Sequence, residues 1–150
     1  SLHNEGVFEI TNAVIDELIK CSGVVKYHFP PTANNQNRLR FFKKVVLLRN
    51  PEDVVRAWMR GDETRAYKLR SPEFAFTFSE EAWLKKAHDL GLVEELHSFA
   101  NGWRNHDGQA LIVEMNDLVH DTSQVLSSIE RYLDLPASEI SFTSSARDSS

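Results

Sequence analysis

The sequence predicts an α/β fold, in which helices flank a parallel β-sheet. Three short apolar runs, which begin at Val24, Val45 and Ala110, have the length and the β-branched content of buried strands. Segments whose apolar residues recur at helical spacing separate these runs. Strands that alternate with helices favour a parallel sheet joined by right-handed crossovers.

The chain has the size and composition of a single globular domain that spans residues 1–150. Of its 150 residues, 41% are hydrophobic and 26% are charged, which is ordinary for a soluble protein. The serine-rich tail, residues 141–150, is predicted to be flexible. No stretch reaches the ~18 apolar residues of a membrane span, and no N-terminal signal is visible. The sequence does not identify the cellular compartment, but the cytoplasm is favoured over the secretory lumen.

Helix signals fill the segments around the strands. The first helix is predicted over residues 5–21, where Cys21 lies with Val14, Leu18 and Ile19, so this single cysteine is expected to be a buried packing thiol. Later helices are predicted from Pro51 to near Gly61, from Ser79 to Gly91, from Leu92 to about Trp103, and from Asp121 or Thr122 onward. The tryptophans favour core packing, whereas the alternating Phe74, Phe76 and Phe78 fit either a half-buried strand or a lid over an acceptor pocket.

The end of the second strand carries the first candidate site. Asn50 suits a helix N-cap, and Pro51 suits the first helical position. The acidic residues Glu52 and Asp53 then suit the positive end of the helix dipole. Arg49 therefore leaves the carboxyl end of a strand, the edge of an α/β sheet where ligands usually bind. Its planar guanidinium suits phosphate, although an ion pair with Asp53 or another carboxylate explains the residue equally well.

The first strand offers further candidates. It follows Gly23, which suits a helix stop, and it ends at Pro30 and Pro31. Side chains two positions apart on a strand share a face, so Lys26 and His28 are expected to lie together. A histidine can remove a hydroxyl proton near neutral pH, and a neighbouring lysine can stabilise a developing anion. A structural role is nevertheless more frequent for a single histidine.

Three segments, taken in order, resemble the sulfotransferases that use 3′-phosphoadenosine 5′-phosphosulfate. The Lys26-x-His28-x-Pro30 run is similar to the catalytic strand of that family, and residues 49–55 are similar to its 3′-phosphate strand and helix. Residues 110–118 and 132–136 are similar to its later strand, its Glu-Asp-Leu-like corner and its Leu-Gly-Leu-Pro-like helix end. The resemblance covers residues 24–136 and implies a three-layer P-loop-type parallel sheet, of which this chain would contain a part.

The resemblance also implies roles for individual residues. His28 matches the general base that activates the acceptor, and Lys26 matches a residue beside the transferred sulfuryl group. Arg49 matches the ligand of the 3′-phosphate of the cofactor, 3′-phosphoadenosine 5′-phosphosulfate or the product 3′-phosphoadenosine 5′-phosphate. The family's second phosphate ligand, a serine, corresponds to Ala57, so Arg56 would compensate only through a shifted helix start.

The main departure from the family is its 5′-phosphosulfate loop, which is missing before the first strand. The segment Cys21-Ser22-Gly23 closes a helix, whereas the family's loop opens one and binds phosphate with backbone amides. Sulfuryl transfer requires charge neutralisation on the transferred and leaving groups. Two functions therefore stay open: a sulfotransferase whose loop is supplied from elsewhere, or a noncatalytic protein of this fold that binds a nucleotide or a protein partner.

Charge and composition limit the classes of molecule that this chain is expected to bind. The net charge is -5, yet residues 18–51 hold seven cations and no acid, a pattern of either an anion site or a solvated face. The acidic balance argues against nucleic acid, and the histidine spacing with one cysteine argues against a metal centre. The acceptor is expected to be a small molecule, a carbohydrate or a protein. An uncovered sheet edge would favour a homodimer, strand exchange or a missing N-terminal segment.

Overall fold

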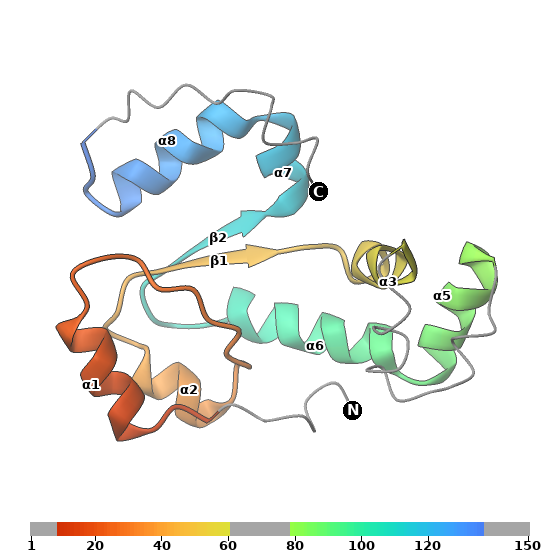
Figure 1. Ribbon diagram of the computed structural model, residues 1–150, viewed down its shortest axis with the longest axis horizontal. Helices are drawn as coiled ribbons and strands as arrows, with labels where there is room; N and C mark the ends of the chain where they lie inside the picture. The colour runs from red at the N-terminus through yellow and green to blue at the C-terminus, as the bar shows by residue number, and fades with distance from the viewer. Residues whose placement is uncertain (1–8, 61–78, 137–150) are drawn as a thin grey trace.

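The computed structural model describes residues 9–60 and 79–136. Within these ranges the chain is an α/β protein with a short two-stranded parallel sheet, as the alternation of elements predicted (Figure 1). The elements, in order, are α1 (Asn12–Lys20), α2 (Ala33–Arg38), β1 (Lys44–Leu48), α3 (Pro51–Arg60), α5 (Glu80–Asp89), α6 (Leu92–Arg104), β2 (Ala110–Glu114), α7 (Met115–His120) and α8 (Thr122–Tyr132). The tail and the phenylalanine-rich segment, with Phe74, Phe76 and Phe78, lie outside the described residues.

The two strands run side by side in the same direction. Their register pairs Lys44 with Ala110 at one end and Leu48 with Glu114 at the other. Both carboxyl ends therefore meet at one edge of the sheet, where β1 leads into α3 and β2 into α7 (Figure 1). Helices α7 and α8 lie on one side of the strands, and α1, α2 and α6 lie on the other.

The strand predicted to begin at Val24 does not form. Residues 24–31 have no regular secondary structure, and among the described residues β1 pairs only with β2. The side chain of Val24 is 87% exposed. A strand needs a ladder partner, but the carbonyl of Phe29 accepts a hydrogen bond from the indole Nε1 of Trp103 over 3.1 Å. The described sheet therefore has two strands where the sequence analysis expected three.

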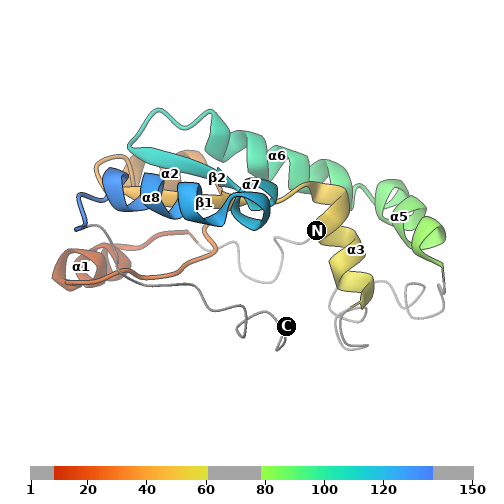
Figure 2. The same cartoon turned by 90° about the horizontal axis from the view of Figure 1, so that it is seen from above.

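Apolar side chains form two buried clusters. One lies between the sheet and the N-terminal helices, where Ile10, Phe29, Leu39 and Trp103 are buried and Val46 of β1 packs against them. The other joins α3, α5 and the start of α6; its buried members are Val55, Trp83, Ala87, Leu92 and Val93. Figure 2 shows α3 and α5 grouped beside that end of α6. The core packing predicted for Trp83 and Trp103 is confirmed, and Trp58 is half-buried against the second cluster.

A buried asparagine fixes the turn between the first irregular segment and the sheet. Asn35 is fully buried; its Oδ1 accepts the N–H of Ile10 over 2.8 Å, and its Nδ2 donates to the carbonyl of Pro30 over 3.0 Å. It lies on α2, a helix that the sequence analysis did not predict. The hydroxyl of Thr32 caps that helix by accepting the N–H of Asn35 over 3.1 Å.

The prediction that Cys21 is a buried packing thiol is wrong. Cys21 is exposed, because it lies one residue beyond the last turn of α1 and serves as its C-cap. Its Sγ accepts the N–H of Gly23 over 3.4 Å. Val14 and Leu18 pack against the core as predicted, whereas Ile19 is 67% exposed, and the helix ends before it can turn Cys21 onto the core-facing side.

Candidate functional site

The carboxyl edge of the sheet places a cation beside a helix N-terminus. Arg49 directly follows β1 and is exposed. The next residue, Asn50, caps α3: its Oδ1 accepts the N–H of Glu52 over 2.9 Å, and its carbonyl accepts the N–H of Val54 over 3.0 Å. These contacts confirm the helix start that Asn50 and Pro51 predicted. The guanidinium of Arg49 and the positive end of α3 both favour an anion here.

The carboxylates around Arg49 bind other cations. Asp53, the predicted alternative partner, accepts from Nη1 of Arg56 over 2.9 Å. Glu114, at the end of the neighbouring strand, accepts from Nη2 of Arg104 over 2.7 Å. In the part of the chain that the structure describes, no hydrogen bond or ion pair engages the side chain of Arg49. The carboxylate pairing that explained this arginine equally well from sequence is therefore not made among the described residues.

Arg56 is the centre of an ion-pair network and is not directed to a free site. Besides Asp53, it contacts Oε2 of Glu52 over 3.6 Å and Oε1 of Glu80 over 3.0 Å. These pairs join α3 to the start of α5. A second role for Arg56 on a phosphate would require it to leave carboxylates on two helices. Ala57, which follows it, is half-buried in α3.

Lys26 and His28 lie on the irregular segment and are both exposed. Because this segment is not a strand, the alternation that was to put them on one face does not apply. No hydrogen bond or ion pair among residues 9–60 and 79–136 joins either side chain to the other or to Arg49. The segment is nevertheless anchored, since Phe29 is buried and the ring of Tyr27 stacks on it with 4.5 Å between centroids.

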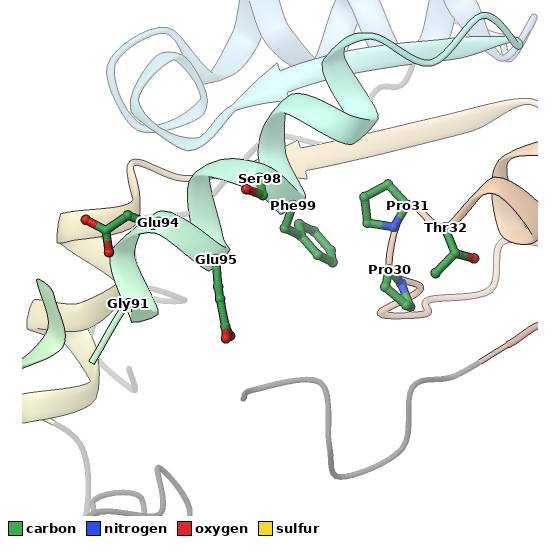
Figure 3. A pocket seen from close by; sticks show the side chains of 8 residues that line it. All are labelled: Pro30, Pro31, Thr32, Gly91, Glu94, Glu95, Ser98 and Phe99. Atoms are coloured by element: carbon green, nitrogen blue, oxygen red, sulfur yellow. The ribbon is translucent and has the colours of Figure 1, made fainter. Parts of the chain in front are cut away.

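A groove of about 610 Å³ opens next to this anchored segment (Figure 3). One wall is formed by Pro30, Pro31 and Thr32, and the other by residues at and after the start of α6, namely Gly91, Glu94, Glu95, Ser98 and Phe99. The ring of Phe99 lies across from the two prolines, so apolar side chains face each other across this part of the groove. The groove begins at Pro30, two positions after His28, the predicted base.

Several cations of the basic run have partners among the described residues. Arg40 pairs with Asp107 over 3.0 Å, and Lys43 pairs with Asp134 over 2.7 Å. Lys44 points its Nζ at main-chain carbonyls, including that of Phe42 over 2.7 Å. Arg49 differs from these cations in being exposed at a sheet edge without such a partner among the described residues.

Sequence reasoning missed the pair formed by Arg104 and Glu114. These residues end α6 and β2, and they lie ten positions apart along the chain. A charged residue at the end of a helix or a strand is common. Arg104 and Glu114 meet only because the chain returns after α6 and places β2 beside it. No local signal in the sequence would have identified this pair.

Within the described ranges, no group of three or more His, Cys, Asp or Glu side chains is arranged to hold a metal ion. None of the helices found there combines the length and apolar character that crossing a bilayer requires. Comparisons of the chain with known protein families, with curated proteins and with solved structures each find no match.

Proposed function

We propose that this chain is a sulfotransferase-like protein that binds 3′-phosphoadenosine 5′-phosphosulfate and takes part in the transfer of its sulfuryl group to an acceptor hydroxyl or amine. Arg49 carries this proposal: it is exposed at the carboxyl edge of β1, directly before the capped start of α3, and no described carboxylate pairs with it. A guanidinium fork and a helix N-terminus together favour a phosphate dianion. The resemblance of residues 24–136 to the sulfotransferases identifies that phosphate as the 3′-phosphate of the nucleotide.

The proposal includes a larger sheet than the two described strands. The side chains of Val45 and Leu47 on β1 are 38% and 50% exposed, although both are apolar. Exposed apolar residues on a strand are expected where a sheet face or edge is covered by a further segment or chain. We therefore expect a further segment, or a second copy of the chain in a homodimer, to complete a three-layer P-loop-type sheet. We also propose that the protein is cytoplasmic.

Within this function the candidate residues have separate roles. Arg49 binds the 3′-phosphate, His28 removes the acceptor proton, and Lys26 stabilises charge on the sulfuryl group. Arg56 holds the first turns of α3 and α5 together through its carboxylate partners, and it contacts the nucleotide only if those pairs open. The acceptor, whether a small molecule, a carbohydrate or a protein, would approach along the groove beside Pro30 and Pro31.

A noncatalytic binding protein of the same fold is the second candidate. It is favoured by the irregular course of residues 24–31, which leaves Lys26 and His28 without a contact to Arg49 among the described residues. Such a protein would keep the nucleotide site at Arg49 and lack transfer.

Calorimetric titration with 3′-phosphoadenosine 5′-phosphate tests the nucleotide site. The protein should bind this ligand more tightly than adenosine 5′-phosphate, which lacks the 3′-phosphate. Arg49→Gln should weaken binding roughly 10- to 100-fold and abolish the preference, because a hydrogen-bonded charge contributes about 1.5–3 kcal/mol. Arg131→Gln, which removes an exposed arginine from α8, is the matched control and should bind like the wild type. Equal affinity for the two nucleotides would contradict the proposal.

A sulfate-transfer assay with labelled cofactor and a panel of hydroxyl and amine acceptors separates the two candidates. Transfer that is lost in His28→Ala, with nucleotide binding retained, supports the enzyme. Binding without transfer to any acceptor supports the noncatalytic protein. Transfer that continues unchanged in His28→Ala removes His28 as the base.

A further inference from the structure

His88 lies between two carboxylates that belong to two other helices. It is on α5; its Nε2 is 3.1 Å from Oε1 of Glu52 on α3, and its Nδ1 is 3.1 Å from Oε1 of Glu94 on α6. Its side chain is 41% exposed, so protons exchange freely with solvent. Both ring nitrogens therefore meet an acceptor, and the ring bridges three helices at once.

The geometry requires a particular protonation state. An ionised carboxylate has no proton to donate, and a neutral imidazole carries only one N–H. If the ring were neutral, one nitrogen lone pair would face a carboxylate oxygen and the contact would be repulsive. Both contacts are hydrogen bonds only when both nitrogens are protonated, that is, when His88 is an imidazolium between two carboxylates.

We propose that His88 is a proton-controlled clasp that holds the first turns of α3 and α6 against α5 and loosens as the pH rises. Glu52 and Glu94 are on the first turns of their helices, where a negative charge also suits the helix dipole. When His88 loses its proton, these carboxylates are left with one hydrogen bond between them from the ring. The contact between the three helices then depends on the apolar cluster, on the ion pairs of Arg56, and on the hydrogen bond of 2.8 Å from Nε1 of Trp83 on α5 to the carbonyl of Val55 on α3.

The two carboxylates that face the ring act in the same direction, and the nearby cations Arg56 and His97 act on those carboxylates. From α3, Glu52 reaches His88 with Oε1 while its Oε2 is 3.6 Å from Arg56. From α6, Glu94 faces the ring, and His97 lies further along that helix and adds a positive field at Glu94. Hydrogen bonds from His88 to Glu94 and then to Glu52 raise the pKa of His88 more than its partial desolvation lowers it.

The sign of the pH effect follows from this raised pKa. A histidine with a higher pKa in the folded than in the unfolded chain stabilises the fold fully below the unfolded value, about 6.5. That contribution is lost as the pH rises through the folded-state pKa. The clasp stands independently of the phosphate site, since it needs only His88, Glu52 and Glu94. It would still affect both candidate regions, because Glu52 is in the first turn of the helix beside Arg49 and Glu94 lines the groove.

Urea denaturation of the full chain at about pH 6 and about pH 9 tests the clasp. The wild type should have a higher denaturation midpoint than His88→Gln at the lower pH, and this difference should shrink or vanish at the higher pH. Other titrating groups are shared by both proteins and cancel in the difference. His120→Gln, which removes an exposed histidine from α7, should follow the wild type at both pH values. A difference that is absent, or the same at both values, would overturn the clasp.

A ring titration by NMR keeps the test decisive if His88→Gln folds poorly. In the wild type, the His88 ring signals should titrate at a higher pH than those of a free histidine, and both ring nitrogens should carry protons below that midpoint. Glu52→Gln and Glu94→Gln should each move the midpoint down. A neutral ring at about pH 6, or a midpoint that neither variant changes, would show that the two contacts do not hold a proton.

Discussion

Arg104 and Glu114 form an ion pair at the carboxyl edge of the sheet, with 2.7 Å between Nη2 and Oε1 and a second contact of 3.1 Å from Nε. Glu114 pairs in register with Leu48, the residue before Arg49, so this carboxylate belongs to the same edge as the candidate phosphate site. By binding Glu114, Arg104 removes a negative charge that would otherwise repel an anion or capture Arg49.

Arg104→Gln should therefore weaken the binding of 3′-phosphoadenosine 5′-phosphate by about two- to fivefold, since a partly exposed charge contributes up to ~1 kcal/mol. The double variant Arg104→Gln/Glu114→Gln has the net charge of the wild type and should restore affinity. Calorimetric titration at low salt measures both effects. Equal binding by the wild type and the single variant would show that Glu114 does not act on this site.

The buried side chain of Asn35 is predicted to be important for stability. Asn35→Ala leaves the N–H of Ile10 and the carbonyl of Pro30 without their partner, both in the interior. Each orphaned group costs about 1–3 kcal/mol, so the free energy of unfolding should fall by roughly 2–4 kcal/mol in urea denaturation. Asn37→Ala, on an exposed position of the same helix, should change it by less than about 0.5 kcal/mol. Similar losses in the two variants would mean that the helix itself, and not the buried amide, is sensitive.

The sequence predicted best those elements whose signals are local. Asn50 and Pro51 mark the start of α3, and the hydroxyl of Ser79 caps α5 by accepting the N–H of Ala82 over 3.1 Å. Gly91 separates α5 from α6 with a φ of 74°, in the left-handed region that glycine adopts most easily. In each case the residue type and the backbone state that it favours lie at the same position, so no distant contact is needed.

The failures concern structure that depends on distant partners. Val24 and Val25 have high strand propensity, but a strand forms only beside another strand, and residues 24–31 pair with none among the described residues. Helix α2 has no apolar stripe in its sequence, Ala-Asn-Asn-Gln-Asn-Arg, and is fixed by the burial of Asn35. Sequence periodicity cannot signal a helix whose buried residue is polar.

The candidate site was only partly predictable for the same reason. The position of Arg49 at a strand end follows from its neighbours in sequence. Its lack of a carboxylate partner depends on Arg56 binding Asp53 and on Arg104 binding Glu114. The first of these pairs is local to α3, whereas the second requires the packing of α6 beside β2.

Gly102 allows the groove wall to approach α6. A Cβ on Gly102 would lie 2.4 Å from Cγ of Pro31, so Gly102→Ala must push the proline or the helix aside. The clash costs about 1–3 kcal/mol and is offset in part by the ~1 kcal/mol that alanine gains in a helix. Thermal or urea unfolding should therefore show a net destabilisation of up to about 2 kcal/mol.

Gly23 provides the matched control for that substitution. A Cβ at Gly23 meets nothing within 4 Å, and its φ is outside the left-handed region. Gly23→Ala should therefore leave stability unchanged or raise it by about 0.4–1 kcal/mol. If Gly102→Ala were as stable as Gly23→Ala, the contact of Pro31 with α6 would be loose enough to absorb a methyl group.

Lys44 is predicted to titrate at an unusually low pH. It begins β1, and its Nζ donates hydrogen bonds to the carbonyls of Leu39 and Phe42. Burial lowers the pKa of Lys44 to about 8. NMR of the lysine Nζ groups should therefore show one signal that titrates near this value, and Lys44→Met should remove it.

The same shift predicts how stability depends on alkaline pH. Between about pH 8 and pH 10.5 the unfolded chain holds the Lys44 proton while the folded chain releases it, so this residue makes the free energy of unfolding rise with pH. Relative to the wild type, Lys44→Met should lack that rise in urea denaturation. Lys85→Met, at an exposed position on α5, should keep it. A parallel pH profile for Lys44→Met and the wild type would mean that the carbonyls of Leu39 and Phe42 hold the ammonium charged through this range and outweigh its desolvation.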